Sequence, residues 1–243
     1  MKRALDLVLG ALALLAFAPV ILVAAALVWL QDRHWPFYSP WRVGRNGERF
    51  RLFKLRSMIV GADKNKVDTT TDADPRITPL GHRIRRYKLD ELPQFANVLL
   101  GQMSLVGPRP NIDREVSLYS PEEQRMLTVR PGITDLSSIV FSDLGTILKT
   151  AEDANIAYNQ LVRPWKSRLA LFYIDHRSLW MDVQLLSLTM VAVISSDRAR
   201  AGVAKLIAAH DAPSELVAIA RRERPLEPTP PPGMTKIVNS REV

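Results

Sequence analysis

Residues 7–30 read LVLGALALLAFAPVILVAAALVWL, a run without a single formal charge. A helix that crosses a bilayer needs about 20 such residues. Basic residues stand on both sides of the run, namely Lys2, Arg3, Arg33, Arg42, Arg45 and Arg49. The stretch therefore predicts a membrane-associated helix at the start of the chain, and every other part of the fold has to be arranged around it.

Three interpretations of this run stay open at the level of sequence. A cleaved signal peptide shares the basic start, but the apolar run continues past Ala24-Ala25-Ala26 to Leu30. A single spanning helix fits the length. A re-entrant helix fits Pro19, which breaks the helix near its middle, and the basic flanks, which favour the cytoplasm for both ends. Its neighbour Ala18 offers no hydroxyl to the freed backbone carbonyls, which weakens this third interpretation.

Composition limits the class of protein. The chain has 243 residues, 33 Lys+Arg against 25 Asp+Glu, 47% hydrophobic residues and no cysteine. This length predicts one domain of ordinary size, or one with appendages. The hydrophobic fraction excludes wholesale disorder, and the lack of cysteine excludes disulfides, Cys-ligated metals and thiol nucleophiles. The net charge of +8 predicts an anionic partner, either a nucleic acid, a membrane surface or a phosphorylated small molecule.

Local patterns beyond the apolar run predict a mainly helical α+β fold. Asn46-Gly47 predicts a small β-hairpin over residues 41–56, with Lys54 and Arg56 on one face of its second strand. Residues 67–78 are polar and predict a loop, in which a metal site at Asp72 and Asp74 is less expected than plain solvation. A helix is predicted over 91–100, with Asp90 as its N-cap, Pro93 in the first turn and Gly101 after its end.

Further helices are predicted toward the C-terminus, namely one that starts at 121–126, then 165–173, 179–194 and one or two over 199–222. The helix at 179–194 is apolar but short for a span, which predicts a buried or interfacial amphipathic helix. The prolines from Pro225 onward predict a loose tail. We therefore expect three parts: a membrane anchor over 1–30, a catalytic domain over 31–196, and a helical extension with a Pro-rich tail over 197–243.

The candidate chemistry lies at Asp90-Glu91. Signatures of P-loops, dinucleotide folds, serine hydrolases and zinc proteases are absent from the sequence, and its four histidines are scattered. The plain interpretation of the pair is a charged helix start. The chemical interpretation is a carboxylate nucleophile that attacks phosphorus, with nearby arginines neutralising the phosphate charge. Asp90 and Glu91 would then also be the ligands of a Mg²⁺ ion, because hard cations prefer carboxylate and phosphate oxygens.

Short motifs around this pair occur in a specific order along the chain: Lys54-Leu55-Arg56-Ser57-Met58, Leu89-Asp90-Glu91-Leu92-Pro93-Gln94, Asn97-Val98-Leu99, Met103-Ser104-Leu105-Val106-Gly107-Pro108-Arg109-Pro110 and Val129-Arg130-Pro131-Gly132-Ile133-Thr134. Each motif alone is weak, but the ordered series is specific. The chain resembles the bacterial sugar transferase family, the monotopic polyprenyl-phosphate phosphoglycosyl transferases, over about residues 1–195.

The resemblance implies a reaction and a set of site residues. A phosphosugar would pass from a nucleotide diphosphate sugar, usually a UDP-sugar, to undecaprenyl phosphate, and UMP would leave. By motif, Asp90 would be the nucleophile and Glu91 its catalytic partner, with Mg²⁺ as the required metal. The expected phosphate-binding residues are Lys54, Arg56, Arg85, Arg109 and, as a weaker candidate, Arg130.

The resemblance also implies an anchor and a location. The family's re-entrant helix breaks at a Ser-Pro pair that falls on Ala18-Pro19 here, and the catalytic domain would lie on the cytoplasmic face of the bacterial inner membrane. The expected partners are the donor, the acceptor and membrane lipid, with no nucleic acid, and a homo-oligomer stays open. The alternative is a non-enzymatic, membrane-anchored basic adaptor that binds anionic lipid or nucleic acid.

Departures from the family pattern limit what can be carried over. Thr134 is followed by Asp135-Leu136-Ser137-Ser138-Ile139 where many members continue differently, and this region is expected to help select the sugar. An acidic position of some members falls on Ala170. The sugar, the pathway and the role of the residues after 196 are therefore not assigned from the sequence.

Overall fold

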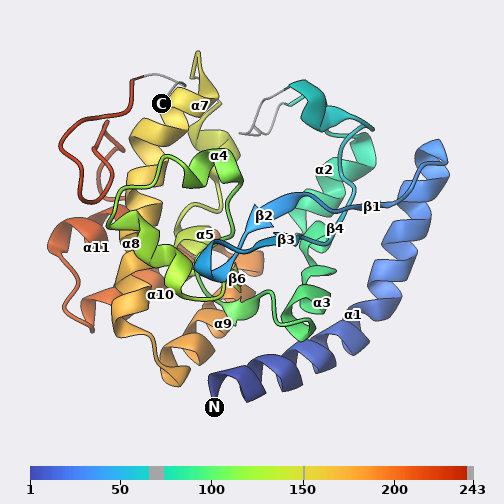
Figure 1. Ribbon diagram of the computed structural model, residues 1–243, viewed down its shortest axis with the longest axis horizontal. Coiled ribbons are helices and arrows are strands. Elements are labelled where there is room, and N and C mark those ends of the chain that lie inside the picture. Colours follow the sequence, from blue (N-terminus) through green and yellow to red (C-terminus); the bar gives the residue numbers. More distant parts are fainter. Residues whose placement is uncertain (66–73, 150, 240–243) are drawn as a thin grey trace.

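The computed structural model describes residues 1–65, 74–149 and 151–239, which form a mainly helical α+β fold (Figure 1). This confirms the predicted fold class. The longer helices are α1 (Lys2–Asp32), α8 (Arg163–His176), α9 (Leu179–Ile194) and α10 (Ser196–Ala208). The shorter helices are α2 (Pro79–Arg86), α3 (Gln94–Leu99), α4 (Asp113–Val116), α5 (Leu136–Val140), α6 (Leu144–Ile147), α7 (Ala154–Ala157) and α11 (Ser214–Arg221). The strands are β1 (Phe37–Tyr38), β2 (Trp41–Val43), β3 (Arg49–Arg51), β4 (Lys54–Leu55), β5 (Ser104–Val106) and β6 (Gly132–Thr134).

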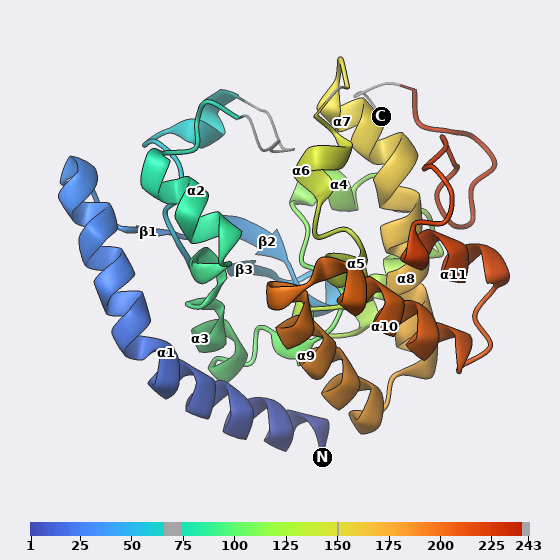
Figure 2. The ribbon, with the colours of Figure 1, turned by 180° about the vertical axis from the view of Figure 1, so that it is seen from behind.

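The apolar run forms α1, which curves around the outside of the molecule (Figure 1, Figure 2). Pro19 lies inside this helix, where its missing N–H and its ring account for a bend. Among the described residues, α1 is the helix long and apolar enough to cross a membrane. Most of its exposed side chains are apolar, including Val8, Leu12, Leu15, Leu22 and Val23. This exposed face supports association with a membrane.

Both ends of α1 are bonded to the rest of the protein. Near its start, the buried carboxylate of Asp6 accepts hydrogen bonds from the Ser104 hydroxyl, at 2.9 Å and 3.0 Å, and from the Leu105 amide, at 3.0 Å. At its end, Asp32 accepts two hydrogen bonds of 2.6 Å from the guanidinium group of Arg56. The two ends of the anchor are therefore held by one and the same body.

α3 packs against α1. A Cβ atom on Gly10 would lie 3.2 Å from a methyl group of Val98, so the small residue permits close contact between the two helices. The rings of Phe17 and Phe95 stack with their centres 6.3 Å apart. The guanidinium group of Arg3 donates to the carbonyl oxygen of Val98 at 2.8 Å and thereby caps the end of α3.

The predicted hairpin is present but shorter than expected. β2 pairs with β3 in antiparallel register, with Arg42 opposite Phe50, and Asn46 and Gly47 in the connecting turn both have positive φ. The chain then leaves this ribbon, and β4 pairs with β1 in a second antiparallel sheet. Residues 41–56 thus do not form one hairpin, because the strand that carries Lys54 turns toward a different partner.

Two glycines bring β5 and β6 together as a parallel pair that the sequence analysis did not predict. Ser104 lies opposite Gly132, and Val106 lies opposite Thr134. A Cβ atom on Gly132 would lie 2.1 Å from the backbone nitrogen of Gly107, and one on Gly107 would lie 2.5 Å from the carbonyl oxygen of Arg130. Only glycine permits this approach, and it fixes the start of the loop that carries Arg109.

The main hydrophobic core joins β5, α5, α8 and α9 to the C-terminal helices α10 and α11. Helices at 165–173 and 179–194 are confirmed as parts of α8 and α9, and the predicted segment 199–222 forms α10 and α11. Val203, Ile207 and Ile219 are at most 1% exposed. The extension after residue 196 therefore supplies part of the core, while the division of the chain into three parts stays a prediction.

The expectation of a loose C-terminal tail is wrong for residues 229–238. The Thr229 amide donates to the carbonyl of Gln160 at 3.0 Å, and the amide group of Gln160 donates to the carbonyl of Val238 at 2.9 Å. The hydroxyl of Ser120 donates to the carbonyl of Pro232 at 2.6 Å. Proline excludes regular structure but not docking, because the carbonyls of the prolines still accept hydrogen bonds.

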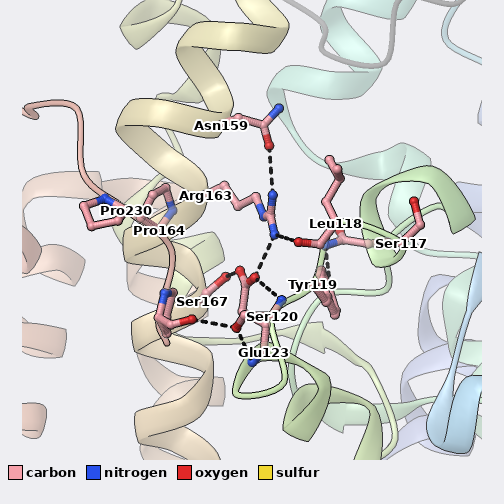
Figure 3. Close-up of polar contacts among 12 residues, drawn as sticks. Ser117, Leu118, Tyr119, Ser120, Glu123, Asn159, Arg163, Pro164, Ser167 and Pro230 are labelled. Atoms are coloured by element: carbon pink, nitrogen blue, oxygen red, sulfur yellow. Dashed lines mark hydrogen bonds and ion pairs between the residues drawn. The ribbon is translucent and has the colours of Figure 1, made fainter. Parts of the chain in front are cut away.

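A buried ion pair supports the surface on which this tail docks (Figure 3). Glu123, fully buried, accepts from Arg163 at 2.7 Å, from the hydroxyl of Ser167 at 2.6 Å and from the Ser120 amide at 3.0 Å. The predicted helix start at 121–126 is a 3₁₀ helix over Glu123–Thr128. The pair links this turn to α8, and Arg163 also donates to the carbonyl of Leu118 at 2.7 Å and to Asn159 at 3.3 Å, which helps to offset the cost of burying the charge.

Of the predicted loop 67–78, residues 67–73, with Asp72, lie outside the described residues. Asp74 at its end is buried and accepts hydrogen bonds from Arg76 at 2.6 Å and 2.9 Å. The carboxylate of Asp74 therefore has an arginine partner.

Candidate active site

The acidic pair lies in a tight turn just before α3. Lys88 adopts the left-handed conformation, with φ 54°, and Leu89–Glu91 then forms one turn of 3₁₀ helix. α3 itself begins at Gln94, with Pro93 at the N-cap position. The prediction that Asp90 caps this helix is wrong, because Asp90 lies in the 3₁₀ turn that precedes the cap position. Asp90 is instead 7% exposed and faces the side chains of the site.

Two cations from distant parts of the sequence meet this pair. The ammonium group of Lys54, on β4, lies 3.6 Å from a carboxylate oxygen of Asp90 and 3.3 Å from one of Glu91. The guanidinium group of Arg109 donates a short hydrogen bond to the same oxygen of Glu91. Lys54, Asp90, Glu91 and Arg109 therefore form one cluster, which we call the acidic-pair site.

Charge in this cluster keeps Glu91 ionised. Burial by itself raises the pKa of Glu91, but the nearby charges of Arg109 and Lys54 and the hydrogen bond from Arg109 outweigh it and hold the pKa well below its usual value of 4.5. Glu91 raises the pKa of Arg109 in return. At neutral pH the side chain of Glu91 is therefore a carboxylate in contact with two cations, and it is poorly suited to carry a proton.

Asp90 differs from its neighbour in an important way. Glu91 takes the hydrogen bond from Arg109, whereas the contact of Asp90 with Lys54 is longer, at 3.6 Å. A carboxylate oxygen that is near cations but not tightly bonded keeps lone pairs free for attack on an electrophile. The geometry therefore suits Asp90 to act as a nucleophile and Glu91 to orient the cations that surround it.

Two charged residues near this cluster were not named as candidates by the sequence analysis. Asp135 caps α5, accepts from the Ser138 amide at 2.7 Å and contributes to the raised pKa of Arg109. The ammonium group of Lys166, on α8, lies 5.5 Å from the ring centre of Tyr158. Burial lowers the pKa of Lys166, and the positive charge of Arg109 lowers it further. A lysine within an otherwise buried helix is the signal that would have found it.

The other predicted phosphate-binding residues lie elsewhere. Arg56 is bonded to Asp32 at the end of α1, and Arg130 donates to the carbonyl of Gly101 at 2.8 Å. Arg85 is half-buried on α2, and its charge helps to lower the pKa of Asp74. The structure thus brings Lys54 and Arg109 to the acidic pair and gives Arg56 and Arg130 bonds to other parts of the fold.

The donor set of the acidic-pair site fits a magnesium ion that shares its ligands with a substrate. Within residues 1–65, 74–149 and 151–239, no three His, Asp or Glu side chains converge on a common point. Asp90 and Glu91 alone supply two carboxylates, and Mg²⁺ is commonly held by one or two carboxylates together with substrate phosphates and water. The two side chains would hold the ion only with a phosphorylated ligand beside them.

Comparison with known proteins places these observations in context. The model of the family described as bacterial sugar transferase matches residues 1–196. The UDP-N-acetylgalactosamine-undecaprenyl-phosphate N-acetylgalactosaminephosphotransferase of Aeromonas hydrophila is 32% identical over 206 residues, which cover 82% of this chain and 45% of the relative. The chain thus spans less than half the length of that protein.

Other relatives are closer to this chain in length. The exopolysaccharide production protein ExoY of Sinorhizobium fredii is 33% identical over 65% of this chain and 77% of its own length. The UDP-glucose:undecaprenyl-phosphate glucose-1-phosphate transferase of Caulobacter vibrioides is 34% identical over 82% of this chain and 71% of its own length. The residues matched by the family model, 1–196, include the anchor and the acidic-pair site.

Proposed function

Because this chain belongs to the bacterial sugar transferase family, we propose that it transfers a sugar phosphate from a UDP-sugar to undecaprenyl phosphate and releases UMP. The names of the Aeromonas and Caulobacter relatives support this donor and acceptor. The observation that carries the proposal is the buried Asp90, with Lys54 and Glu91 beside it and the membrane helix α1 near by.

The first step of the proposed reaction is attack by a carboxylate oxygen of Asp90 on the phosphorus that bears the sugar. A bond forms between this oxygen and phosphorus, and the bond to the bridging oxygen breaks, so UMP leaves with the electron pair. Lys54 and Arg109 neutralise charge on the diphosphate as it develops. Magnesium, held by Asp90 and Glu91, supplies further charge neutralisation when bound.

The second step is attack by the phosphate oxygen of undecaprenyl phosphate on the same phosphorus. The bond to Asp90 breaks, its carboxylate is restored and the lipid-linked diphosphate sugar is released. In both steps Glu91 remains ionised and keeps Arg109 and Lys54 in place, in agreement with its lowered pKa. No proton has to be moved by Glu91, which separates this scheme from one in which it acts as an acid.

The first test measures UMP release from a panel of UDP-sugars with purified full-length protein, undecaprenyl phosphate and Mg²⁺. We expect Asp90→Asn to lower the rate by at least about 10³-fold, because the amide is a far weaker nucleophile. Glu48→Gln, an exposed carboxylate on the hairpin, is the matched control and keeps the parent rate. Parent-like UMP release by Asp90→Asn contradicts the role of Asp90, and no release from any donor favours the adaptor alternative.

The same family membership leads us to propose that α1 is re-entrant and that both of its ends face the cytoplasm. An unbent helix of 31 residues is about 46 Å long, which would separate its ends by more than a bilayer core. Asp6 and Asp32, near the two ends, are bonded to Ser104 and Arg56 of the same body. A spanning helix would have to break one of these contacts.

Cysteine labelling tests this topology, and the cysteine-free chain gives no background. Ala4→Cys and His34→Cys place single thiols at exposed positions near the two ends of α1. In inverted membrane vesicles, whose cytoplasmic face points outward, we expect a membrane-impermeant maleimide to label both variants. Labelling of one variant only, with the other protected until detergent is added, would show a spanning helix.

A further inference from the structure

A cationic pocket lies beside the start of α1, away from the acidic-pair site. Its volume is about 340 Å³, far above the ~15 Å³ that holds one water molecule. Its basic lining residues come from separate segments of the chain, namely Lys2, Arg3, Arg45, Arg130 and Arg177. Since Lys54, Asp90, Glu91 and Arg109 do not line it, the pocket is a different site.

Positive charge in this pocket exceeds the negative charge that faces it. The carboxylate that lines it, Asp6, is already bonded to Ser104 and to the Leu105 amide. Lys2 forms an ion pair of 2.5 Å with Asp182. Even with both carboxylates counted, the arginines leave a net positive charge that favours an anionic ligand.

Two of these arginines are fixed in place by neutral partners. Arg3 donates to the carbonyls of Val98 and Leu99, and Arg130 donates to the carbonyl of Gly101 at 2.8 Å. A carbonyl orients a guanidinium group without cancelling its charge, so both side chains keep their full charge and remaining donors. The end of α3 thereby holds a preformed pair of cations, while the acidic pair lies before its start.

The position of the pocket indicates where its ligand comes from. The exposed apolar face of α1 begins at Val8, which is 59% exposed. The start of α1 also lies next to α9 in both views of the molecule (Figure 1, Figure 2). There Trp180, 68% exposed, follows Arg177 closely in sequence. A pocket at the polar edge of an apolar surface lies at the depth of lipid headgroups, where a tryptophan is also favoured.

We propose that this pocket binds the phosphate headgroup of an anionic membrane lipid, at a site separate from the reaction centre. Its volume and its number of cations favour a headgroup with two phosphates over one with a single charge. The ligand chemistry that the pocket recognises is a phosphate group, because guanidinium groups bind paired phosphate oxygens. A soluble phosphate has the same chemistry, so the experiment has to separate the two sources.

The test uses the full-length protein in a neutral detergent, with cardiolipin as the probe and native mass spectrometry to count bound lipid. The variant is Arg45→Gln with Arg177→Gln, since both side chains are exposed at the pocket. We expect it to bind cardiolipin roughly 30-fold more weakly, at about fivefold for each basic residue. The matched control, Arg198→Gln with Lys205→Gln, removes two exposed cations of α10 and keeps the parent affinity.

Further arms decide the chemistry and the source. Arg45→Lys with Arg177→Lys keeps both charges but not the guanidinium geometry, so we expect its affinity to lie between those of the parent and the glutamine variant. Phosphatidylcholine is expected to bind far more weakly than cardiolipin. Equal binding of phosphatidylcholine, parent affinity in the glutamine variant, or displacement of the lipid by an equal concentration of pyrophosphate would each overturn the proposal.

Discussion

At the scale of single residues, the two carboxylates of the acidic pair differ although they are neighbours in sequence. One carboxylate oxygen of Glu91 contacts both Arg109 and Lys54. Burial raises the pKa of Glu91, but these two charges outweigh it and hold the pKa well below its usual value. Among the residues that the structure describes, the ionic contact of Asp90 is the longer one of 3.6 Å with Lys54. These contacts support the proposed roles, in which Glu91 positions the cations and Asp90 is the nucleophile.

Loss of the Glu91 charge is expected to disable the site without removing the nucleophile. In Glu91→Gln, Arg109 loses its ionic partner and Lys54 is drawn toward Asp90, so we expect UMP release to fall roughly 10²- to 10³-fold. The measurement is the rate of UMP release with Glu48→Gln as control. A rate within threefold of the parent would show that Glu91 does not orient these cations.

The same ion pairs predict how stability depends on pH. A carboxylate whose pKa is lowered by folding stabilises the folded state above its unfolded pKa, about 4.5, and loses this contribution as pH falls toward the folded pKa. We therefore expect the difference in free energy of unfolding between the parent and Glu91→Gln to shrink from pH 7 to pH 3.5. Denaturant unfolding at several pH values measures it, and a difference that does not change with pH contradicts the assignment.

The sequence was sufficient to predict part of this site. Asp90, Glu91, Lys54 and Arg109 were grouped by motif, and the structure brings them together. The partners of the remaining arginines were not predictable, because Arg56 and Arg130 bond to groups far away in sequence and motif spacing carries no information on them. These two assignments as substrate-binding residues stay predictions.

At the scale of elements, the loop that carries Arg109 is positioned by the contact of β5 with β6. Long segments rich in apolar residues predicted the helices α8 and α9. This pattern could not predict β5 and β6, which are three residues each and pair across 25 residues of intervening chain. Short strands of this kind depend on tertiary contacts and leave little pattern in the sequence.

A methyl group at this crossing is expected to move Arg109. In Gly107→Ala the new Cβ would lie 2.5 Å from the carbonyl oxygen of Arg130, and backbone must shift to relieve it. A displacement near 1 Å can cost about 10² in rate, so we expect UMP release to fall 10- to 100-fold with the anchor still in the membrane. Gly10→Ala is the control, because its Cβ would contact side chains of Val98 and Leu99, at 3.2 Å and more, and no backbone atom. Equal losses in both variants would contradict this argument.

At the scale of the whole molecule, the residues beyond the matched family region belong to the same core as the rest. α10 and α11 pack with α8 and α9, and Arg222 contacts Asp143 at 2.8 Å. The sequence predicted these helices but not their burial. An amphipathic pattern shows that one face of a helix is buried, but it does not show which other element packs against that face. The prediction of a loose tail was wrong for a similar reason, since the carbonyls of Pro230 and Pro232 accept hydrogen bonds from distant elements.

Removal of a buried side chain from α10 is expected to destabilise the entire protein. Ile207 is fully buried, and Ile207→Ala should lower the free energy of unfolding by about 2–5 kcal/mol. Lys205→Ala on the exposed face of the same helix should stay within about 0.5 kcal/mol. Thermal unfolding in detergent measures both. A parent-like stability for Ile207→Ala would mean that the extension folds independently of the catalytic region.

The attachment of α1 at both ends has a consequence for how the protein meets bilayers of different thickness. Helices that run from one leaflet to the other accommodate thick or thin membranes by tilting. Under the proposed topology α1 cannot tilt in this way, because Asp6 and Asp32 bond its two ends to the same body of the protein. The acyl length of a single leaflet, and not the full width of the membrane, then sets the hydrophobic match.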